Sequence, residues 1–382
     1  MSASRRSGIS PFYVMEVMKA AAERDEVEGD VLHLEVGQPS TPAPRLALEA
    51  AAEALESDRL GYTAATGIPE LRRRISRLYL DRHGLDIDPG RVAVTVGASG
   101  GFTLAVLSCF DVGDRVAMTE PGYAAYRNIL EALGIEVVPI TVDAESGFNL
   151  SLDRLAAAMP LAGVVVASPS NPTGTVIADD EMRRLAGFCR EARIRVISDE
   201  IYHGITFGVS AACALGHDED AVVIQSFSKY QSMTGWRVGW MVVPEHLAAP
   251  VERLAQNLFI SPPAISQLAA MEALEAGDEL DGHVARYRTN RDILVSGLAR
   301  MGIDRVAPPD GAFYVWADIG HLGIDSAELC RRWLDETGVA VTPGVDFDRA
   351  MGHRFVRFSY SESTSDVEEA VARLTAWIDR AV

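Results

Sequence analysis

Residues 221–239 read AVVIQSFSKYQSMTGWRVG. The first five residues, of which four are apolar, predict a buried strand, so the polar residues that follow lie in a loop at its carboxyl end. In that loop Ser226 and Ser228 offer hydroxyl donors, and Arg237 offers a guanidinium that can bind a phosphate through two parallel hydrogen bonds. Lys229 lies between them. Taken alone, this pattern predicts either a phosphate site beside a reactive amine or an ordinary basic, hydroxyl-rich surface loop.

The use of lysine singles out Lys229. The chain has 35 basic residues, but only Lys19 and Lys229 are lysine and all the others are arginine. Arginine is always protonated and forms no Schiff base, whereas a lysine amine does so readily. Lys229 is therefore a candidate for covalent chemistry that arginine cannot perform.

Composition and charge limit the function further. The 382 residues are 48% hydrophobic and 23% charged, which is typical of a globular protein of two or three domains. A net charge of −19 disfavours binding to nucleic acid or to an anionic membrane surface. The four cysteines are widely spaced without a C-x-x-C pair, which predicts reduced thiols rather than disulfides or a metal site. We therefore expect a soluble, cytoplasmic protein without a metal, a membrane span or a nucleic-acid partner.

From residue 43 onward the sequence alternates between helical patterns and short apolar runs. Helices are expected at 43–58, 69–83, 99–110, 123–133 and 180–192. Strands are expected at 91–96, 115–119, 135–140, 163–167, 195–198 and 221–225. Several of these strands are apolar throughout, as in sheets that helices cover on both faces. We therefore predict an α/β domain with a mainly parallel sheet, whose ligand lies at the carboxyl ends of the strands.

After about residue 280 the pattern changes. The elements expected there are a long polar helix at 282–299, strands at 312–317 and 355–359, a helix at 326–336 and a last helix at the C-terminus. They predict a second, smaller α/β unit that the N-terminal segment joins. We place the large domain at 43–282, and the small domain at 1–42 together with 283–382.

Three further segments carry polar or small residues at expected strand ends. Residues 168–174 read SPSNPTG, residues 199–202 read DEIY, and residues 96–101 read VGASGG. Alone, the first segment predicts a tight turn, and the second predicts either a carboxylate and a phenol that face one ligand or a helix cap. The third is a glycine-rich turn, which can let backbone N–H groups approach an anion at a helix N-terminus. Arg357 lies within an aromatic strand, where an arginine usually pairs with a structural or a substrate carboxylate.

Together, in this order and spacing, these elements resemble the fold-type-I pyridoxal-phosphate enzymes, specifically the class I/II aminotransferases. The resemblance rests on S-F-S-K-x-x-x-M-x-G-W-R-x-G, S-N-P-T-G and D-E-I-Y, and it extends from Gly37 to Arg357. It implies a large domain with a seven-stranded, mainly parallel sheet between helices and a smaller α/β domain. It also implies pyridoxal 5′-phosphate as cofactor and transfer of the α-amino group of an L-amino acid to a 2-oxo acid, which we expect to be 2-oxoglutarate.

The resemblance implies catalytic roles for three residues. Lys229 would form the aldimine with the cofactor and move the proton between the substrate α-carbon and the cofactor's C4′ atom. Asp199 would keep the pyridine nitrogen protonated, which makes the ring an electron sink. Tyr202 would bond the phenolic oxygen of the cofactor, together with Asn171. Tyr123 would stack on the ring face, or else be a core tyrosine at a helix start.

Other implied roles concern binding and assembly. The phosphate would be held by Ala98, Ser99, Ser226, Ser228 and Arg237. Arg357 would bind the substrate α-carboxylate, with help from the Gly37 backbone and Asn171. Tyr62 would reach the phosphate of a neighbouring subunit, so the expected active unit is a homodimer; a hydrophobic contact residue is the alternative.

One departure limits the substrate prediction. No lysine in the turn at 97–101 meets a distal carboxylate, and no particular arginine is identified for that task, so strict aspartate specificity is not expected. The apolar stretch at 11–15 forms either a lid over the site or an amphipathic helix packed on the dimer, and we favour the helix. Two alternatives to transamination stay open, namely a lyase that performs β-elimination with the same cofactor and a non-catalytic effector-binding domain.

Overall fold

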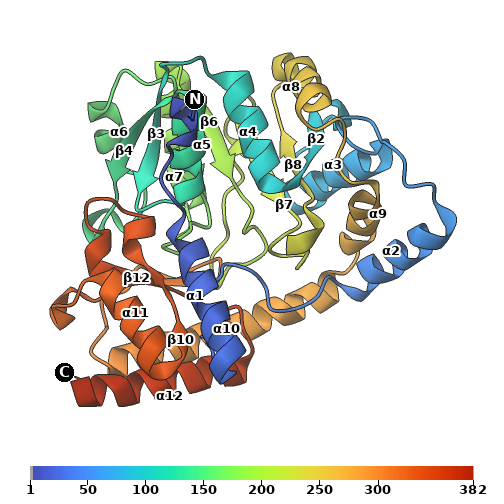
Figure 1. The fold of residues 1–382 in the computed structure, drawn as a ribbon. Coiled ribbons are helices and arrows are strands. Elements are labelled where there is room, and N and C mark those ends of the chain that lie inside the picture. Colours follow the sequence, from blue (N-terminus) through green and yellow to red (C-terminus); the bar gives the residue numbers. More distant parts are fainter. Residues whose placement is uncertain (1–2, 382) are drawn as a thin grey trace.

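The computed structural model describes residues 3–381, and its centre is a sheet of seven strands (Figure 1). The outermost residues of the predicted small domain, 1–2 and 382, lie outside this range. The strand order is β2-β8-β7-β6-β5-β3-β4. The strands are β2 (Val92–Thr95), β3 (Arg115–Glu120), β4 (Glu136–Thr141), β5 (Gly163–Ala167), β6 (Arg195–Asp199), β7 (Val222–Ser226) and β8 (Gly239–Val242). Only β8 runs antiparallel to its neighbours, β2 and β7, which confirms the mainly parallel sheet.

Helices cover both faces of this sheet. The helices on one face or at its edge are α2 (Arg45–Ser57), α3 (Pro69–His83), α6 (Leu152–Ala157), α7 (Asp179–Ala192) and α9 (Ala264–Ala273). The helices on the other face are α4 (Gly97–Cys109), α5 (Ala124–Leu133) and α8 (Glu245–Leu258). Along β5, Val164 and Val166 join the first core, whereas Val165 joins the second. Strand side chains alternate between faces, so a strand buried on both sides is apolar throughout.

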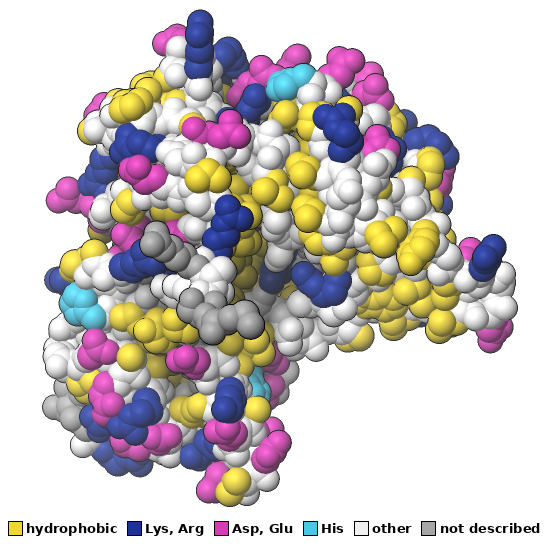
Figure 2. All heavy atoms as spheres, turned by 45° about the horizontal axis from the view of Figure 1, so that its top comes forward, with side chains coloured by type: hydrophobic (Ala, Val, Ile, Leu, Met, Phe, Trp, Pro, Cys, Tyr) yellow, Lys and Arg dark blue, Asp and Glu magenta, His cyan; other side chains and the backbone are white. Residues whose placement is uncertain are grey.

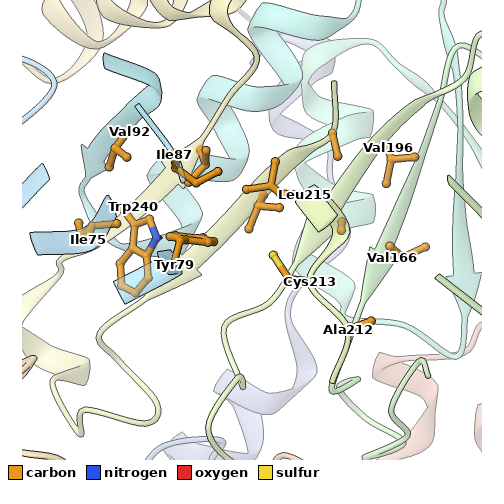
Figure 3. Packing of buried hydrophobic residues seen from close by; sticks show 14 of the residues in the cluster. Ile75, Tyr79, Ile87, Val92, Val166, Val196, Ala212, Cys213, Leu215 and Trp240 are labelled. Carbon is orange, nitrogen blue, oxygen red and sulfur yellow. Dashed lines mark hydrogen bonds between the residues drawn. The ribbon is translucent and has the colours of Figure 1, made fainter. Parts of the chain in front are cut away.

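Figure 3 shows part of the first core, where Trp240 of β8 lies beside Tyr79 of α3. The indole nitrogen of Trp240 donates a hydrogen bond of 3.3 Å to the Tyr79 hydroxyl. Because both side chains are buried, this bond satisfies polar atoms that water does not reach.

The C-terminal part builds a second, smaller layer with the N-terminal helix (Figure 1). Its three-stranded antiparallel sheet has the order β11-β12-β9, and a parallel pair, β1 with β10, lies beside it. These strands are β1 (Leu32–His33), β9 (Tyr314–Asp318), β10 (Val339–Ala340), β11 (Thr342–Pro343) and β12 (Phe355–Ser359). The helices are α1 (Tyr13–Glu28), α10 (Gly277–Arg300), α11 (Ser326–Thr337) and α12 (Thr364–Ala381).

Most elements expected from the sequence are present within one or two residues of their predicted ends. The sequence analysis did not place α6, α8, α9, β8 and the two-residue strands β1, β10 and β11, and it left α1 as one of two possibilities. The helix expected at 282–299 begins earlier, at Gly277, so the proposed domain boundary at 282–283 falls inside α10 and stays a prediction. Among the described helices, none is both long and apolar enough to cross a membrane.

Candidate active site

The carboxyl ends of β5, β6 and β7 open into a cavity of about 260 Å³. Ala167 at the end of β5 pairs in register with Asp199 of β6, and Asp199 pairs with Ile224 of β7. The loops after these strands therefore leave the sheet at one edge. The predicted site residues that line the cavity are Gly37, Ala98, Ser99, Tyr123, Asn171, Asp199, Tyr202, Ser226, Ser228, Lys229, Arg237 and Arg357.

Lys229 lies in the loop that follows β7. Its Nζ donates a hydrogen bond of 2.5 Å to the carbonyl oxygen of Gly37, which comes from the N-terminal segment. Burial, together with the nearby Arg357 cation, lowers the pKa of the Lys229 amine to about 8, although Asp199 acts in the opposite direction. A larger share of the amine is therefore neutral near pH 7 than in a free lysine, and the neutral amine is the nucleophile.

Asp199 ends β6 and is only 4% exposed. Burial raises the pKa of its carboxyl to about 6, against two hydrogen bonds that favour the ionised form. One comes from the backbone N–H of Ile201 at 3.0 Å, and the other comes from the hydroxyl of Tyr126 on α5. Sequence reasoning missed Tyr126. It follows Tyr123 by three residues, a spacing that brings both rings to one side of a helix start.

Tyr123, directly before α5, and Tyr126, in its first turn, both line the cavity. The rings of Tyr123 and Tyr126 pack edge to face with centroids 5.3 Å apart. Burial raises the pKa of Tyr123 to about 12, so its phenol stays protonated at neutral pH. The structure therefore brings Tyr123 to the cavity rather than to a core remote from it.

Arg357 enters the cavity from β12 of the small sheet and is 3% exposed. It donates to Asn171 Oδ1 at 3.0 Å, to Thr342 Oγ1 at 3.2 Å and to the carbonyl oxygen of Glu35. Its Nε is buried without a hydrogen-bond partner. Within residues 3–381 the structure contains no ion pair between Arg357 and a carboxylate. A buried cation with an orphaned donor fits an anionic group that enters from outside the chain.

The N-terminus of α4 faces Arg237 and the two serines of the loop. Gly97 begins this helix with a φ of +66°, and a Cβ at this position would collide with the Arg237 guanidinium. The Ser226 and Ser228 hydroxyls are hydrogen-bonded to each other at 2.9 Å. The first N–H groups of a helix have no intrahelical acceptor, so this corner offers backbone, hydroxyl and guanidinium donors to one anion.

The N-terminal stretch forms an apolar wall of the cavity. Phe12, Val14 and Met18 line it, and the Phe12 ring packs edge to face on Tyr123 at 5.6 Å. The helix predicted for this stretch is present as α1, and its first residues also line the cavity, as the lid alternative expected; packing of this helix on a dimer stays a prediction. The Asp346 carboxylate, 1% exposed, holds this turn by accepting hydrogen bonds of 3.2 Å from the N–H groups of Tyr13 and Val14.

Tyr62 is the one predicted site residue that does not line the cavity. It lies in the loop between α2 and α3 and is 85% exposed. Leu55 of α2 and Ile260 beyond α8 are also exposed. Figure 2 shows hydrophobic side chains gathered on the right-hand side of the molecule, the side on which Figure 1 places α2 and α9.

Comparison with known proteins identifies the class. The family model of aminotransferase class I and II matches residues 29–374. The chain belongs to this family, which confirms the aminotransferase prediction, the fold type and pyridoxal phosphate as cofactor. The assignment favours transamination over the lyase and the effector-binding domain.

Individual relatives are similar over nearly their whole length. A valine–pyruvate aminotransferase of Mycobacterium tuberculosis is 50% identical over 98% of this chain and 97% of that protein. An arginine–pyruvate transaminase of Pseudomonas aeruginosa is 33% identical over 93% of this chain and 91% of that protein. The crystal structure of an aminotransferase from Mycobacterium tuberculosis has a TM-score of 0.97 and 49% identity, covering 99% of both chains.

The residues of the cavity fit pyridoxal phosphate. The corner at Gly97 and Arg237 suits the phosphate, because a side chain at Gly97 would fill the space where the anion meets the guanidinium. Asp199 and Lys229 line the same cavity as this corner, and so do Tyr202 and Asn171. The chemistry of these donors matches a phosphorylated pyridine aldehyde, which needs an anion site, a carboxylate for its ring nitrogen and an amine.

Proposed function

We propose that this aminotransferase takes the amino group from an L-amino acid with a neutral, apolar side chain and passes it to pyruvate. The observation that carries the proposal is the apolar wall of Phe12, Val14 and Met18. The cations among the described residues that line the cavity are Lys229, Arg237 and Arg357, and each has a role at the amine, phosphate or α-carboxylate.

The choice of acceptor follows from the same wall. Burying the distal carboxylate of 2-oxoglutarate against apolar side chains without a partner costs several kcal/mol. The methyl group of pyruvate carries no such penalty. The names of the two pyruvate-dependent relatives support this acceptor, and we propose it in place of the 2-oxoglutarate expected from the sequence.

Pyridoxal phosphate, when bound, withdraws electrons from the α-carbon of the substrate. The chain supplies the proton transfers and the positioning. We assign Lys229 Nζ to take the α-proton and to return it at C4′ of the cofactor, and the Asp199 carboxylate to hold a proton on the pyridine nitrogen. Tyr202 and Asn171 donate to the phenolic oxygen.

Two anion sites orient the substrate. The phosphate corner fixes one end of the cofactor, and Arg357 binds the α-carboxylate of the amino acid with Gly37 and Asn171 beside it. Arg357 and the phosphate corner would thereby hold both ends of the reacting pair in the cavity that Lys229 also lines. Such positioning lowers the barrier by as much as about 7–11 kcal/mol in favourable model reactions.

A spectrum of the holoenzyme tests this function. We expect valine to bleach the visible band of the bound cofactor, and pyruvate to restore it much faster than 2-oxoglutarate does. Lys229→Ala is the control that loses the covalent band. Bleaching by aspartate with recovery by 2-oxoglutarate would refute the proposed substrates, and release of ammonia would indicate a lyase.

We also propose a homodimer in which Tyr62 completes the phosphate site of the partner subunit. Its 85% exposure and the exposed apolar residues Leu55 and Ile260 support a second copy as the partner. Mixed dimers of Tyr62→Ala and Lys229→Ala would contain one site with both changes and one intact site. We therefore expect mixing to restore activity that both parents lack, whereas sites confined to one subunit would not complement.

The cytoplasmic location stays a prediction from the sequence. All four cysteines are free thiols, and Cys189, Cys213 and Cys330 are buried, which supports a reducing compartment. Fractionation of cells that express the protein at its natural level tests it.

A further inference from the structure

Tyr314 occupies a position in the cavity that sequence reasoning did not assign. It begins β9 of the small sheet and is 1% exposed. Its hydroxyl oxygen lies 2.6 Å from that of Tyr202, which is 3% exposed and follows β6 of the large sheet. The two phenols therefore form a buried hydrogen bond between the two sheets, and its geometry allows either oxygen to donate.

Three further contacts fix the Tyr314 side chain. The Arg357 guanidinium lies over its ring, with the central carbon 4.6 Å from the ring centroid. The Phe313 ring packs edge to face on it at 5.0 Å. Its hydroxyl lies so close to Gly37 that a Cβ there would collide with it. Tyr314 thus touches the α-carboxylate site, the Gly37 backbone and the tyrosine assigned to the cofactor.

We propose that Tyr314 is a positioning residue that donates its phenolic proton to Tyr202 and thereby directs the Tyr202 proton to the phenolic oxygen of the cofactor. The inference rests on the proposed function, which places Tyr202 on that oxygen. Each phenol has one proton. If Tyr202 donates to the cofactor, the bond between the tyrosines has to run from Tyr314 to Tyr202. A chain of donors also strengthens each bond, by about 10–30%.

The direction of the effect follows from charge. A stronger donor at the phenolic oxygen stabilises its anionic form, so the nitrogen that joins the cofactor to Lys229 loses its proton at lower pH. The Arg357 cation favours the same direction, because it stabilises the negative charge that gathers on the Tyr314 oxygen when that oxygen donates. Tyr314 therefore lowers the pKa of the cofactor's linking nitrogen by acting through Tyr202.

Titration of the visible band of the holoenzyme with pH tests the inference. We expect Tyr314→Phe to raise the midpoint by roughly 0.2–0.7 pH units. This shift corresponds to the fraction by which a chain of donors strengthens one charge-assisted hydrogen bond. The phenyl ring of this variant keeps its packing under Arg357. We therefore expect the Michaelis constant for the amino acid to stay close to that of the unchanged enzyme. Tyr287→Phe is the matched control, because it removes a buried hydroxyl from another ring that packs on Phe313, at 5.6 Å.

Variants of Tyr202 separate the possible failures. We expect Tyr202→Phe to raise the midpoint more than Tyr314→Phe, and the double variant to match Tyr202→Phe alone, because Tyr314 acts through Tyr202. An unchanged or lower midpoint in Tyr314→Phe, additive shifts, or an equal shift in Tyr287→Phe would each overturn the inference alone. An unchanged midpoint in Tyr202→Phe would overturn the assigned role of Tyr202 as well.

Discussion

Replacing Asp346 with alanine is expected to reduce the preference of the enzyme for larger apolar donors. Asp346 lies 332 positions after Val14 in the chain, yet its buried carboxylate caps the first turn of α1. Val14 in that turn and Phe12 directly before it line the cavity. In Asp346→Ala these N–H groups lose their acceptor, so the turn is free to leave the cavity and admit water.

The size of the effect follows from the cost of losing the cap and from the number of substrate carbon atoms that the wall buries. Loss of a helix cap costs about 0.5–2 kcal/mol, enough to loosen one turn without unfolding the protein. Valine has two carbon atoms more than alanine, and each buried carbon contributes about 0.8 kcal/mol. An intact wall therefore favours valine over alanine by about 1.6 kcal/mol, or roughly 15-fold in kcat/KM. We expect this ratio to fall to a few-fold in Asp346→Ala.

The assay is kcat/KM for valine with pyruvate as acceptor, and for alanine with another 2-oxo acid. Alanine needs the other acceptor because its own product is pyruvate. Asp346→Asn keeps one carbonyl acceptor and should show an intermediate ratio. Asp325→Ala is the control, because Asp325 caps α11 through the N–H of Ala327 at 2.9 Å and does not line the cavity. If the two alanine variants lose similar thermal stability and the donor ratio stays unchanged in both, Asp346 does not position the wall.

Three further predictions concern the cofactor. The rate at which the apoenzyme binds pyridoxal phosphate, measured by absorbance, should rise with pH and level off above about 8, because the neutral Lys229 amine reacts. A rate that continues to rise up to about pH 10 would contradict the lowered pKa of Lys229. Asp199→Ala should lose far more in kcat than in cofactor affinity, and a near-normal kcat would rule out its role at the ring nitrogen. Tyr126→Phe removes a bond that lowers the pKa of Asp199, so the acidic limb of the kcat/KM profile should move to higher pH, and an unmoved limb argues against that contact.

The parts of the site that the sequence predicts are those that follow a strand directly. Lys229, Asp199 and Asn171 stand within a few residues of apolar runs, and parallel strands bring such positions to one edge. Tyr126 and Tyr314 have no comparable local pattern. Their roles depend on hydrogen bonds to partners 73 and 112 residues away, and such distances become short only when the sheet and its helices have packed.

The same reason explains the elements that the sequence analysis did not place. β8 has four residues, GWMV, and its place between β7 and β2 depends on ladders to both neighbours rather than on its own pattern. α8 contains Pro250, which interrupts a helical pattern when only the sequence is considered. The longer helices were predictable because their apolar periodicity repeats over several turns.

The two sheets divide the work of the site. The groups assigned to the cofactor leave the large sheet or the start of α4, whereas Arg357 and the first turn of α1, which Asp346 holds, belong to the small layer. Changes in the apolar wall can therefore alter the donor without moving the groups that hold the cofactor. Asn171 and Tyr314 join the two parts, because Asn171 accepts a hydrogen bond from Arg357 and Tyr314 touches both Arg357 and Tyr202. Loss of the Tyr314 ring, as in Tyr314→Ala, should therefore affect carboxylate binding and the protonation of the cofactor together, whereas Tyr314→Phe keeps the ring under Arg357 and should affect mainly the protonation.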